Sequence, residues 1–237
     1  MKKRNPYYLT IITLIAALGG FLFGFDMAVI SGAVPFVQQQ FDLSAVQEGG
    51  FVSSALVGCV IGVAFSGELS DRFGRKPALN LSGSLFFLSA VGTAFAPDFT
   101  LLVIARIMGG IAVGVASNVV PLYISEIAPP RIRGRLVTFY QLAITVGILL
   151  AFLSNAWVLN LSESRPDILL VGFLEKIFID ESWRGMFGAE TIPASIFLIC
   201  LAIVPESPRW LVQQNRSEKA RHILKKLIDE NEIDSSI

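Results

Sequence analysis

The sequence has few of the residues that soluble enzymes use for chemistry. Its 237 residues include one histidine, His222, and two cysteines, Cys59 and Cys200, each cysteine within an apolar run. Such a set supports neither a metal-ligand cluster nor a disulfide framework, and it gives a histidine-based hydrolase little to work with. Nineteen basic and 19 acidic residues cancel, so no overall positive field points to nucleic acid. We therefore expect no metal, no cofactor and no enzymatic activity.

Charge is also scarce, whereas apolar runs are long. Charged residues make up 16% of the chain, hydrophobic residues make up 53%, and the mean hydropathy is +0.63. Crossing a bilayer takes about 20 apolar residues per helix, and these runs are too long for barrel strands of about ten. The sequence therefore predicts an all-α polytopic membrane protein with six spans. They lie at about Leu9–Phe36, Gly50–Gly67, Pro77–Ala96, Phe99–Tyr123, Leu136–Leu159 and Met186–Val204.

Lysine and arginine gather on alternate connections between these spans. The first residues, the segments after spans two and four, and the tail after span six carry most of them. Because basic residues stay on the cytoplasmic side, both termini are expected there, in a cell (inner) membrane. The expected organisation is a cytoplasmic N-terminus (1–8), a six-helix bundle (9–204) and a cytoplasmic helical segment (205–237). We expect no domain in the outer loop Asn160–Trp183.

The tail contains an amphipathic pattern over Ser217–Asn231. Apolar residues recur at helical spacing on one face and basic residues occupy the other. Two arrangements fit this pattern. The helix can lie on the inner membrane surface, where anionic lipids attract its lysines, or it can pack against neighbouring inner segments, and the two arrangements can coexist.

Glycines four residues apart recur in the spans, at Gly20/Gly24, Gly58/Gly62 and Gly110/Gly114. Small residues at this spacing let helices approach closely. A dimerisation face would use them, but packing within one bundle is the interpretation that we favour.

Several motifs resemble one family. The inner segment from Gly67 to Lys76, predicted to be a tight turn, matches G-x-x-x-D-R-x-G-R-[RK] of the major facilitator superfamily. Residues 108–133 resemble the second signature of its sugar porter family. The stretches 205–210 (PESPRW) and 20–26 (GFLFGFD) are similar to the same family. The resemblance implies the N-terminal half of a twelve-span carrier that works by alternating access.

The resemblance also implies roles at the cytoplasmic side. The residues that match the family's inner gate and its charge network contain both signs of charge. They are Asp71, Arg72, Arg75, Glu126, Arg133, Glu206 and Arg209. We expect these groups to pair across the inner helix ends in one state of the carrier and to separate in the other.

Three ionisable residues lie within the predicted spans: Asp26, Arg106 and Glu190. Charges inside hydrocarbon are candidates for function. With a rise of about 1.5 Å per residue, all three fall in the outer half of the membrane, so Asp26 and Arg106 are expected to pair. The pair is either a static salt bridge or a switch that proton binding to Asp26 releases. In the proton-coupled members of the family that the chain resembles, the position of Asp26 takes the proton, with Arg106 and Glu190 in the same group.

A sugar site needs hydrogen-bonding amides or hydroxyls beside an apolar face. Gln141 is the best candidate in the spans, because an amide both donates and accepts; the alternative is an amide that bridges helices. By resemblance, Gln141 contacts sugar hydroxyls and Phe23 lines the site. Ile148 stands where the xylose–proton symporter type has a second glutamine, so a pentose and a hexose both remain possible.

Two functions follow as hypotheses. The first is proton-coupled transport of a monosaccharide, with the expected C-terminal six-helix half supplied in the same chain or by another chain. The second is a membrane module that does not transport, either a truncated half or a sugar-sensing or interaction protein. The complete group Asp26, Arg106 and Glu190, together with the gate motifs, favours the first.

Overall fold

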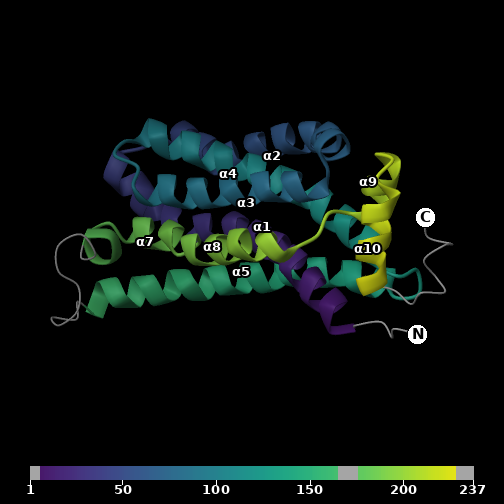
Figure 1. Ribbon diagram of the computed structural model, residues 1–237. Helices are drawn as coiled ribbons and strands as arrows, with labels where there is room; N and C mark the ends of the chain where they lie inside the picture. The colour runs from purple at the N-terminus through teal and green to yellow at the C-terminus, as the bar shows by residue number, and fades with distance from the viewer. Residues whose placement is uncertain (1–5, 165–175, 228–237) are drawn as a thin grey trace.

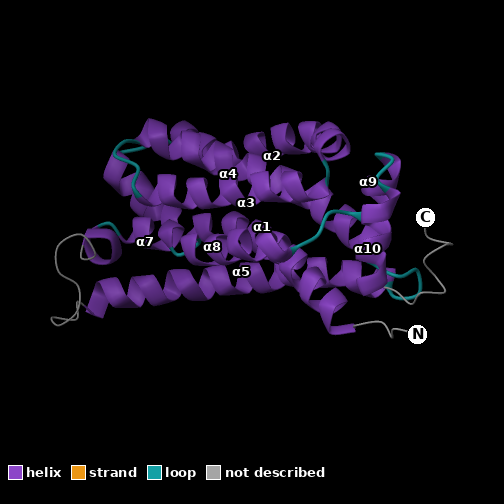
Figure 2. Ribbon diagram, viewed as in Figure 1, coloured by secondary structure: helices purple, strands orange, loops and turns teal. Residues whose placement is uncertain are grey.

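The structure is a computed structural model that describes residues 6–164 and 176–227. Within those residues the chain is helical and contains no strand (Figure 2). The helices are α1 (Pro6–Phe41), α2 (Ala45–Phe73), α3 (Arg75–Ala94), α4 (Phe99–Ile127), α5 (Arg133–Ser164), the π-helical turn η1 (Lys176–Asp180), α7 (Ser182–Gly188), α8 (Thr191–Cys200), the 3-10 turn η2 (Leu201–Ile203), α9 (Pro208–Gln213) and α10 (Ser217–Leu227). The long helices run side by side, and α9 and α10 lie across one end of the bundle (Figure 1).

Local sequence signals set several helix ends. Ser44 and Gln47 form a capping box in which the backbone N–H of each is bound by the other's side chain, and α2 begins there. Asp98 Oδ1 accepts the backbone N–H of Leu101 at 2.8 Å, so α4 begins at Phe99. Gly74, with a φ of 105°, is the one residue between α2 and α3. Such a φ suits glycine, which has no Cβ to clash, and it allows the chain to reverse there.

Some predicted boundaries were wrong. The inner loop expected from Gly67 is helical up to Phe73, so the turn is confined to Gly74. An outer loop was predicted over Asn160–Trp183. In the structure α5 continues to Ser164 and Trp183 belongs to α7, so the connection between them is shorter than predicted. Polar residues at the ends of these spans continue the helix because backbone hydrogen bonding does not stop where the hydrocarbon does. Hydropathy therefore locates a span but not its ends.

The sixth predicted span is interrupted. It consists of α7, α8 and η2, and α7 and α8 are separated at Ala189 and Glu190. The combined segment Ser182–Ile203 is nevertheless long and apolar enough to cross a membrane, as are α1, α2, α4 and α5. The break places Glu190 between two helices, where its side chain is 2% exposed.

The third span, α3, is not among the five segments that qualify by length and hydropathy. It still runs alongside the other long helices (Figure 1). Its hydroxyls bond to backbone carbonyls, Ser82 to Ala112 at 3.0 Å and Ser89 to Ala105 at 2.8 Å. These bonds tie α3 to α4, and they explain how a helix with low hydropathy sits inside the bundle.

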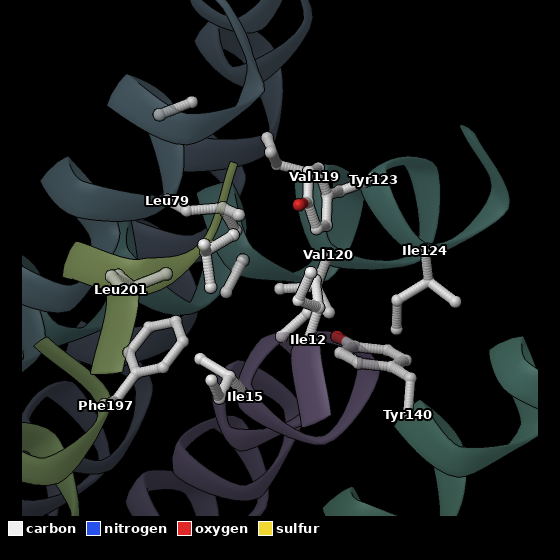
Figure 3. Close-up of a cluster of buried hydrophobic side chains, with 14 of the residues drawn as sticks. Ile12, Ile15, Leu79, Val119, Val120, Tyr123, Ile124, Tyr140, Phe197 and Leu201 are labelled. Carbon is white, nitrogen blue, oxygen red and sulfur yellow. The ribbon is translucent and has the colours of Figure 1, made fainter. Parts of the chain in front are cut away.

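Two large clusters of buried apolar side chains form the core, and a small third cluster joins α9 and α10. The larger joins α1, α3, α4, α5 and α8, with Ile12, Leu79, Val120, Tyr140 and Phe197 among its members (Figure 3). The second lies toward the end at which α1 meets α2, around Phe51, Trp183 and Phe187. Leu224 and Leu227 of α10 belong to the larger cluster.

α10 therefore packs its apolar face against protein. Ala220, Leu224 and Leu227 are buried, whereas Lys219, Lys225 and Lys226 are exposed. Of the two arrangements considered for this helix, the structure shows the packed one. Its basic face is left free, and residues 228–231 of the predicted helix lie outside the described part of the chain.

Glycines bring the helices into contact. A Cβ at Gly58 or Gly62 would strike the backbone of α4 at Ile107 or Ile111, and Gly110 and Gly114 face α2 in the same way. Gly24 of α1 likewise meets the backbone of α5 at Ile144. These glycine pairs thus pack helices within this one chain, as predicted.

This packing leads to a test on two glycines of α2. Gly62→Ala should push α2 away from α4 and lower stability by about 1–3 kcal/mol, the usual effect of overpacking. Gly67→Ala is the matched control because no atom lies within 4 Å of its added Cβ. Thermal unfolding in detergent measures both. Equal melting temperatures for the two variants would contradict this account of the crossing.

Candidate functional site

Helices α1 and α4 hold a buried ion pair between them. Arg106 Nη1 of α4 and Asp26 Oδ1 of α1 are 2.5 Å apart, and each side chain is 1% exposed. The guanidinium also approaches the Asp26 carbonyl, at 3.4 Å from both Nη1 and Nη2. The predicted pairing of these two residues is confirmed. A charge buried this deeply is tolerated because its partner is in contact with it.

Glu190 completes this group. Burial at the α7–α8 break brings its carboxyl group close enough to interact electrostatically with both Asp26 and Arg106. The Arg106 guanidinium lies over the Phe187 ring, 5.3 Å from its centroid, which adds a cation–π contact. Two carboxyl groups and one guanidinium are therefore buried together.

The group keeps unused hydrogen-bonding capacity. Asp26 Oδ2 and Arg106 Nε are buried, and neither has a partner among the described residues. A Cβ at Gly109 would come within 3.4 Å of Asp26 Oδ1 and closer still to Ser89 Oγ, so the glycine leaves room for the carboxylate. Asp26 Oδ2 lacks a donor, but the Asp26 and Glu190 carboxyl groups lie within hydrogen-bonding range of each other, so a proton can be held between the two acids.

The two residues expected to bind sugar do not belong to this buried charged group. Gln141 of α5 is exposed, and its side chain makes no hydrogen bond within the part of the chain that the structure describes. Phe23 of α1 is partly buried against the larger core cluster. Ile148, which follows Gln141 by seven residues on the same face of α5, is 37% exposed. The structure thus leaves the Gln141 amide free for a ligand, and it does not use this amide to bridge helices.

A second charged cluster lies at the end that carries α9 and α10. Arg75, which is 4% exposed, makes two bonds to Glu126 of α4, Nε to Oε2 at 2.9 Å and Nη2 to Oε1 at 3.0 Å. Its Nη1 donates to the Ser70 carbonyl at 3.0 Å and to Asp71 Oδ1 at 3.1 Å. The planar guanidinium suits this two-point contact, and it ties the α2–α3 junction to the end of α4.

Glu206 acts as a cap for a helix that is distant in sequence. Its Oε1 accepts the backbone N–H of Arg75 at 2.9 Å and that of Lys76 at 3.2 Å. The Gly74 N-cap of α3 offers no side chain of its own. A carboxylate here satisfies free N–H groups and interacts favourably with the positive end of the helix dipole.

The remaining predicted gate residues stand outside this cluster. Arg72 is exposed and stacks over Phe73, with 5.4 Å between the guanidinium carbon and the ring centroid. Arg133 and Arg209 are exposed, and neither forms a salt bridge within residues 6–164 and 176–227. The structure therefore brings together Asp71, Arg75, Glu126 and Glu206, and it leaves roles for the three exposed arginines as predictions.

Three further residues fasten this end, and the sequence analysis missed them. Trp210 Nε1 donates to the Asp71 carbonyl at 2.8 Å, Tyr123 Oη donates to the Pro205 carbonyl at 2.8 Å, and Lys76 Nζ donates to the Ala202 carbonyl at 3.1 Å. Each lies inside a motif that the sequence analysis quoted or directly beside one. The signal was therefore present, but the bonds go to backbone atoms, which a motif does not specify.

The opposite end of α3 is held in a related way. Arg184 of α7 donates from Nη1 to the carbonyls of Ala94 at 3.1 Å and Ala96 at 2.7 Å. Glu181 is its ion-pair partner, and the guanidinium lies 4.3 Å from the Trp183 ring centroid. A cation at the C-terminal end of α3 complements the carboxylate at its start.

The capping role of Glu206 can be tested directly. Glu206→Ala removes the acceptor for two backbone N–H groups of α3 and should lower stability by about 0.5–2 kcal/mol, as the loss of a cap does. Glu163→Ala, at an exposed site near the end of α5, is the control and should change little. Unfolding in detergent, followed by tryptophan fluorescence, reports both. An unchanged midpoint for the Glu206 variant would refute the cap.

Known proteins are similar to this chain in sequence and in fold. The chain is 42% identical to the D-xylose-proton symporter of Escherichia coli K12, over 94% of this chain and 49% of that protein. It is 40% identical to the arabinose-proton symporter of Bacillus subtilis, over 95% of this chain and 46% of the relative. The chain therefore spans about half the length of the curated relatives it matches.

Solved structures agree. The proton:xylose symporter XylE bound to 6-bromo-6-deoxy-D-glucose superposes with a TM-score of 0.85 at 39% identity, covering 98% of this chain and 52% of that one. Inward-open XylE from E. coli gives a TM-score of 0.81 at 40% identity, over 97% and 54% of the two chains. These matches confirm the predicted fold, the N-terminal half of a major facilitator transporter. The model of the family named "Sugar (and other) transporter" matches residues 12–237, and the chain belongs to that family of membrane transporters.

Proposed function

We propose that this chain forms the N-terminal half of a carrier that moves a monosaccharide together with a proton by alternating access. The observation that carries the proposal is the buried Asp26–Arg106 pair, with Glu190 beside it. Ionisable residues inside a membrane-spanning bundle are costly, so two acids and an arginine buried together point to a function. Relatives named as xylose–proton and arabinose–proton symporters support the same conclusion.

In this proposal the proton binds at Asp26. Oδ2 has no donor among the described groups and the Glu190 carboxyl lies close to Asp26, so a proton can be shared between the two acids while Oδ1 still faces Arg106. Neutralising the carboxylate weakens the attraction that holds α1 to α4 at this level. Arg106 then depends on Glu190 and the Phe187 ring, its other neighbours. Proton binding would thereby alter the packing of the two helices that meet at the centre of the bundle.

The inner charge cluster would be the counterpart of this switch. Arg75, Glu126 and Glu206 connect the ends of α2, α3 and α4 with the segment that precedes α9. These bonds hold the cytoplasmic helix ends together in one state and would part in the other. Arg133 and Arg209 are exposed and free of salt bridges within the described residues, so they are available to a partner half.

The carrier needs a second six-helix half, in the same chain or another. Large apolar side chains of α2 and α5 are exposed along much of their length, including Val60, Phe65, Leu149 and Leu153. On α5 the free Gln141 amide shares this open side, where a sugar could reach it. We place the termini in the cytoplasm and the bundle, residues 9–204, in the inner membrane. Basic residues of the α4–α5 connection and of α10 support this orientation.

Asp26→Asn tests the proton site. The amide keeps the shape of the side chain but takes up no proton, so uphill sugar accumulation driven by a proton gradient should be abolished. Sugar exchange at equal concentrations should persist. The measurement is uptake of D-xylose, arabinose and glucose into proteoliposomes that contain the intact carrier. Asp98→Asn is the control, because asparagine caps α4 as well as aspartate does. Unchanged uphill uptake by the Asp26 variant would contradict the proposal.

Gln141→Ala tests the sugar site. Loss of one or two hydrogen bonds should weaken sugar binding about threefold to tenfold. Gln39→Ala, an exposed glutamine near the end of α1, should leave binding unchanged. Calorimetric titration of the purified carrier gives the dissociation constants, and a melting curve checks that the variant is folded. An affinity equal to that of the parent would remove Gln141 from the site.

A further inference from the structure

Phe187 of α7 gives Arg106 a neighbour that carries no charge. The guanidinium carbon lies over the ring face, 5.3 Å from its centroid, and Phe187 is 1% exposed. The face of an aromatic ring is electron-rich and attracts a cation, most strongly where water is excluded. This attraction does not depend on whether a nearby carboxyl group is protonated. The ring therefore still attracts the guanidinium when the Asp26 carboxylate is neutral.

The Phe187 ring is held in place by aromatic neighbours. It meets Phe51 of α2 edge to face, with 6.4 Å between the ring centroids, and Trp183 in the same way at 6.5 Å. Trp183 is fastened in turn, since its Nε1 donates to Gln40 Oε1 near the end of α1 at 2.6 Å. The backbone N–H of Glu190 donates to the Phe187 carbonyl at 3.2 Å. One turn of the chain thus supplies both a fixed ring and the second acid.

The groups around Arg106 determine what proton binding changes. Asp26 of α1 and Glu190 at the α7–α8 break are the carboxyl groups beside the guanidinium. Cys59 of α2 lies close enough to Asp26 for its thiol to interact electrostatically with that carboxylate. Ser89 of α3 is also nearby, but its hydroxyl proton is donated to a backbone carbonyl of α4 at 2.8 Å. A proton held by the two acids therefore removes negative charge that faces Arg106.

We infer that Phe187 is a positioning residue of the proton site, whose ring holds the Arg106 guanidinium when a proton neutralises the acids. Before the proton binds, Asp26 already holds the cation, so the ring adds little. After it binds, the cation would otherwise stay buried without compensation, which is costly. The ring thus stabilises the protonated state more than the unprotonated one, and it favours proton binding.

The inference rests on the proposed function and adds a residue to its proton site. The competing role for Phe187 is apolar packing alone. It belongs to the same buried cluster as Phe51 and Trp183, and any apolar side chain of similar volume could fill such a position. The two roles differ in whether the electrons of the ring matter.

Two replacements of Phe187 separate these roles. Trifluorophenylalanine, incorporated by stop-codon suppression, nearly keeps the shape of the ring but withdraws electrons from its face, so the ring attracts a cation far less. Phe187→Leu removes the face and keeps an apolar side chain. The same fluorinated residue in place of Phe86, a buried ring of the larger core cluster, is the matched control. Uphill uptake of D-xylose, arabinose and glucose into proteoliposomes with the intact carrier is measured as the external pH is varied at a constant proton gradient, alongside a melting curve.

The positioning role predicts that both Phe187 variants bind the proton about threefold to tenfold more weakly, so the pH at half-maximal uptake falls by about half a unit to one unit. The fluorinated variant should keep the melting temperature of the parent, and the Phe86 control should match the parent in both measurements. Packing alone predicts that fluorination leaves the pH midpoint unchanged. With proton-driven uptake intact in the parent, that result would overturn this inference and leave the proposed function standing. If the parent shows no proton-driven uptake of these sugars, the proposed function fails with it.

Discussion

A polar group inside hydrocarbon must find its partner within the protein, and most of this structure follows from that requirement. Arg106 and Asp26 meet at 2.5 Å because neither could remain charged alone at that depth. The serines of α3 donate to carbonyls of α4 for the same reason. Once these bonds form, the relative positions of α1, α3 and α4 are largely determined. The glycine contacts then set how closely α2 and α5 approach them.

The third helix shows how the requirement extends to helix ends. The N-cap of α3 is a glycine that offers no side chain. Glu206 supplies acceptors for the N–H groups at one end, and Arg184 supplies donors for the carbonyls at the other. Arg184 lies in the first helix of the interrupted sixth span, and Glu206 directly follows that span. α3 and the sixth span are therefore linked at both membrane faces, so a movement of one should carry the other along.

Sequence reasoning reached much of this arrangement because membranes limit what a chain can do. Apolar length located the spans, and depth along a helix was enough to predict that Asp26 meets Arg106. The ends of the helices were not predictable in the same way. Four of residues 68–73 are polar (Glu68, Ser70, Asp71 and Arg72), yet the chain remains helical until Gly74. Hydropathy carries no information about a helix that continues beyond the bilayer.

The bonds of the inner cluster were harder to predict. The motifs identified Arg75, Glu126 and Glu206 as a group, but they did not distinguish side chain from backbone partners. Glu206 accepts from N–H groups of α3 and not from an arginine side chain, and Trp210 donates to a carbonyl. Such contacts depend on where a helix begins and ends in space.

Some polar groups of this half already have a bonding partner within it, whereas others have none. This difference indicates which parts of the site need a second half. The Asp26–Arg106 pair and the Arg75–Glu126 pair each form within the described helices. The Gln141 amide, in contrast, makes no hydrogen bond with any described residue. The apolar sides of α2 and α5 are similarly uncovered. In the proposed carrier, therefore, the proton would be held by this half alone, whereas the sugar would be enclosed only when a second half covers the open face. Coupling between the two ligands would then pass through α1, which contains Asp26 and packs against α5, the helix that carries Gln141.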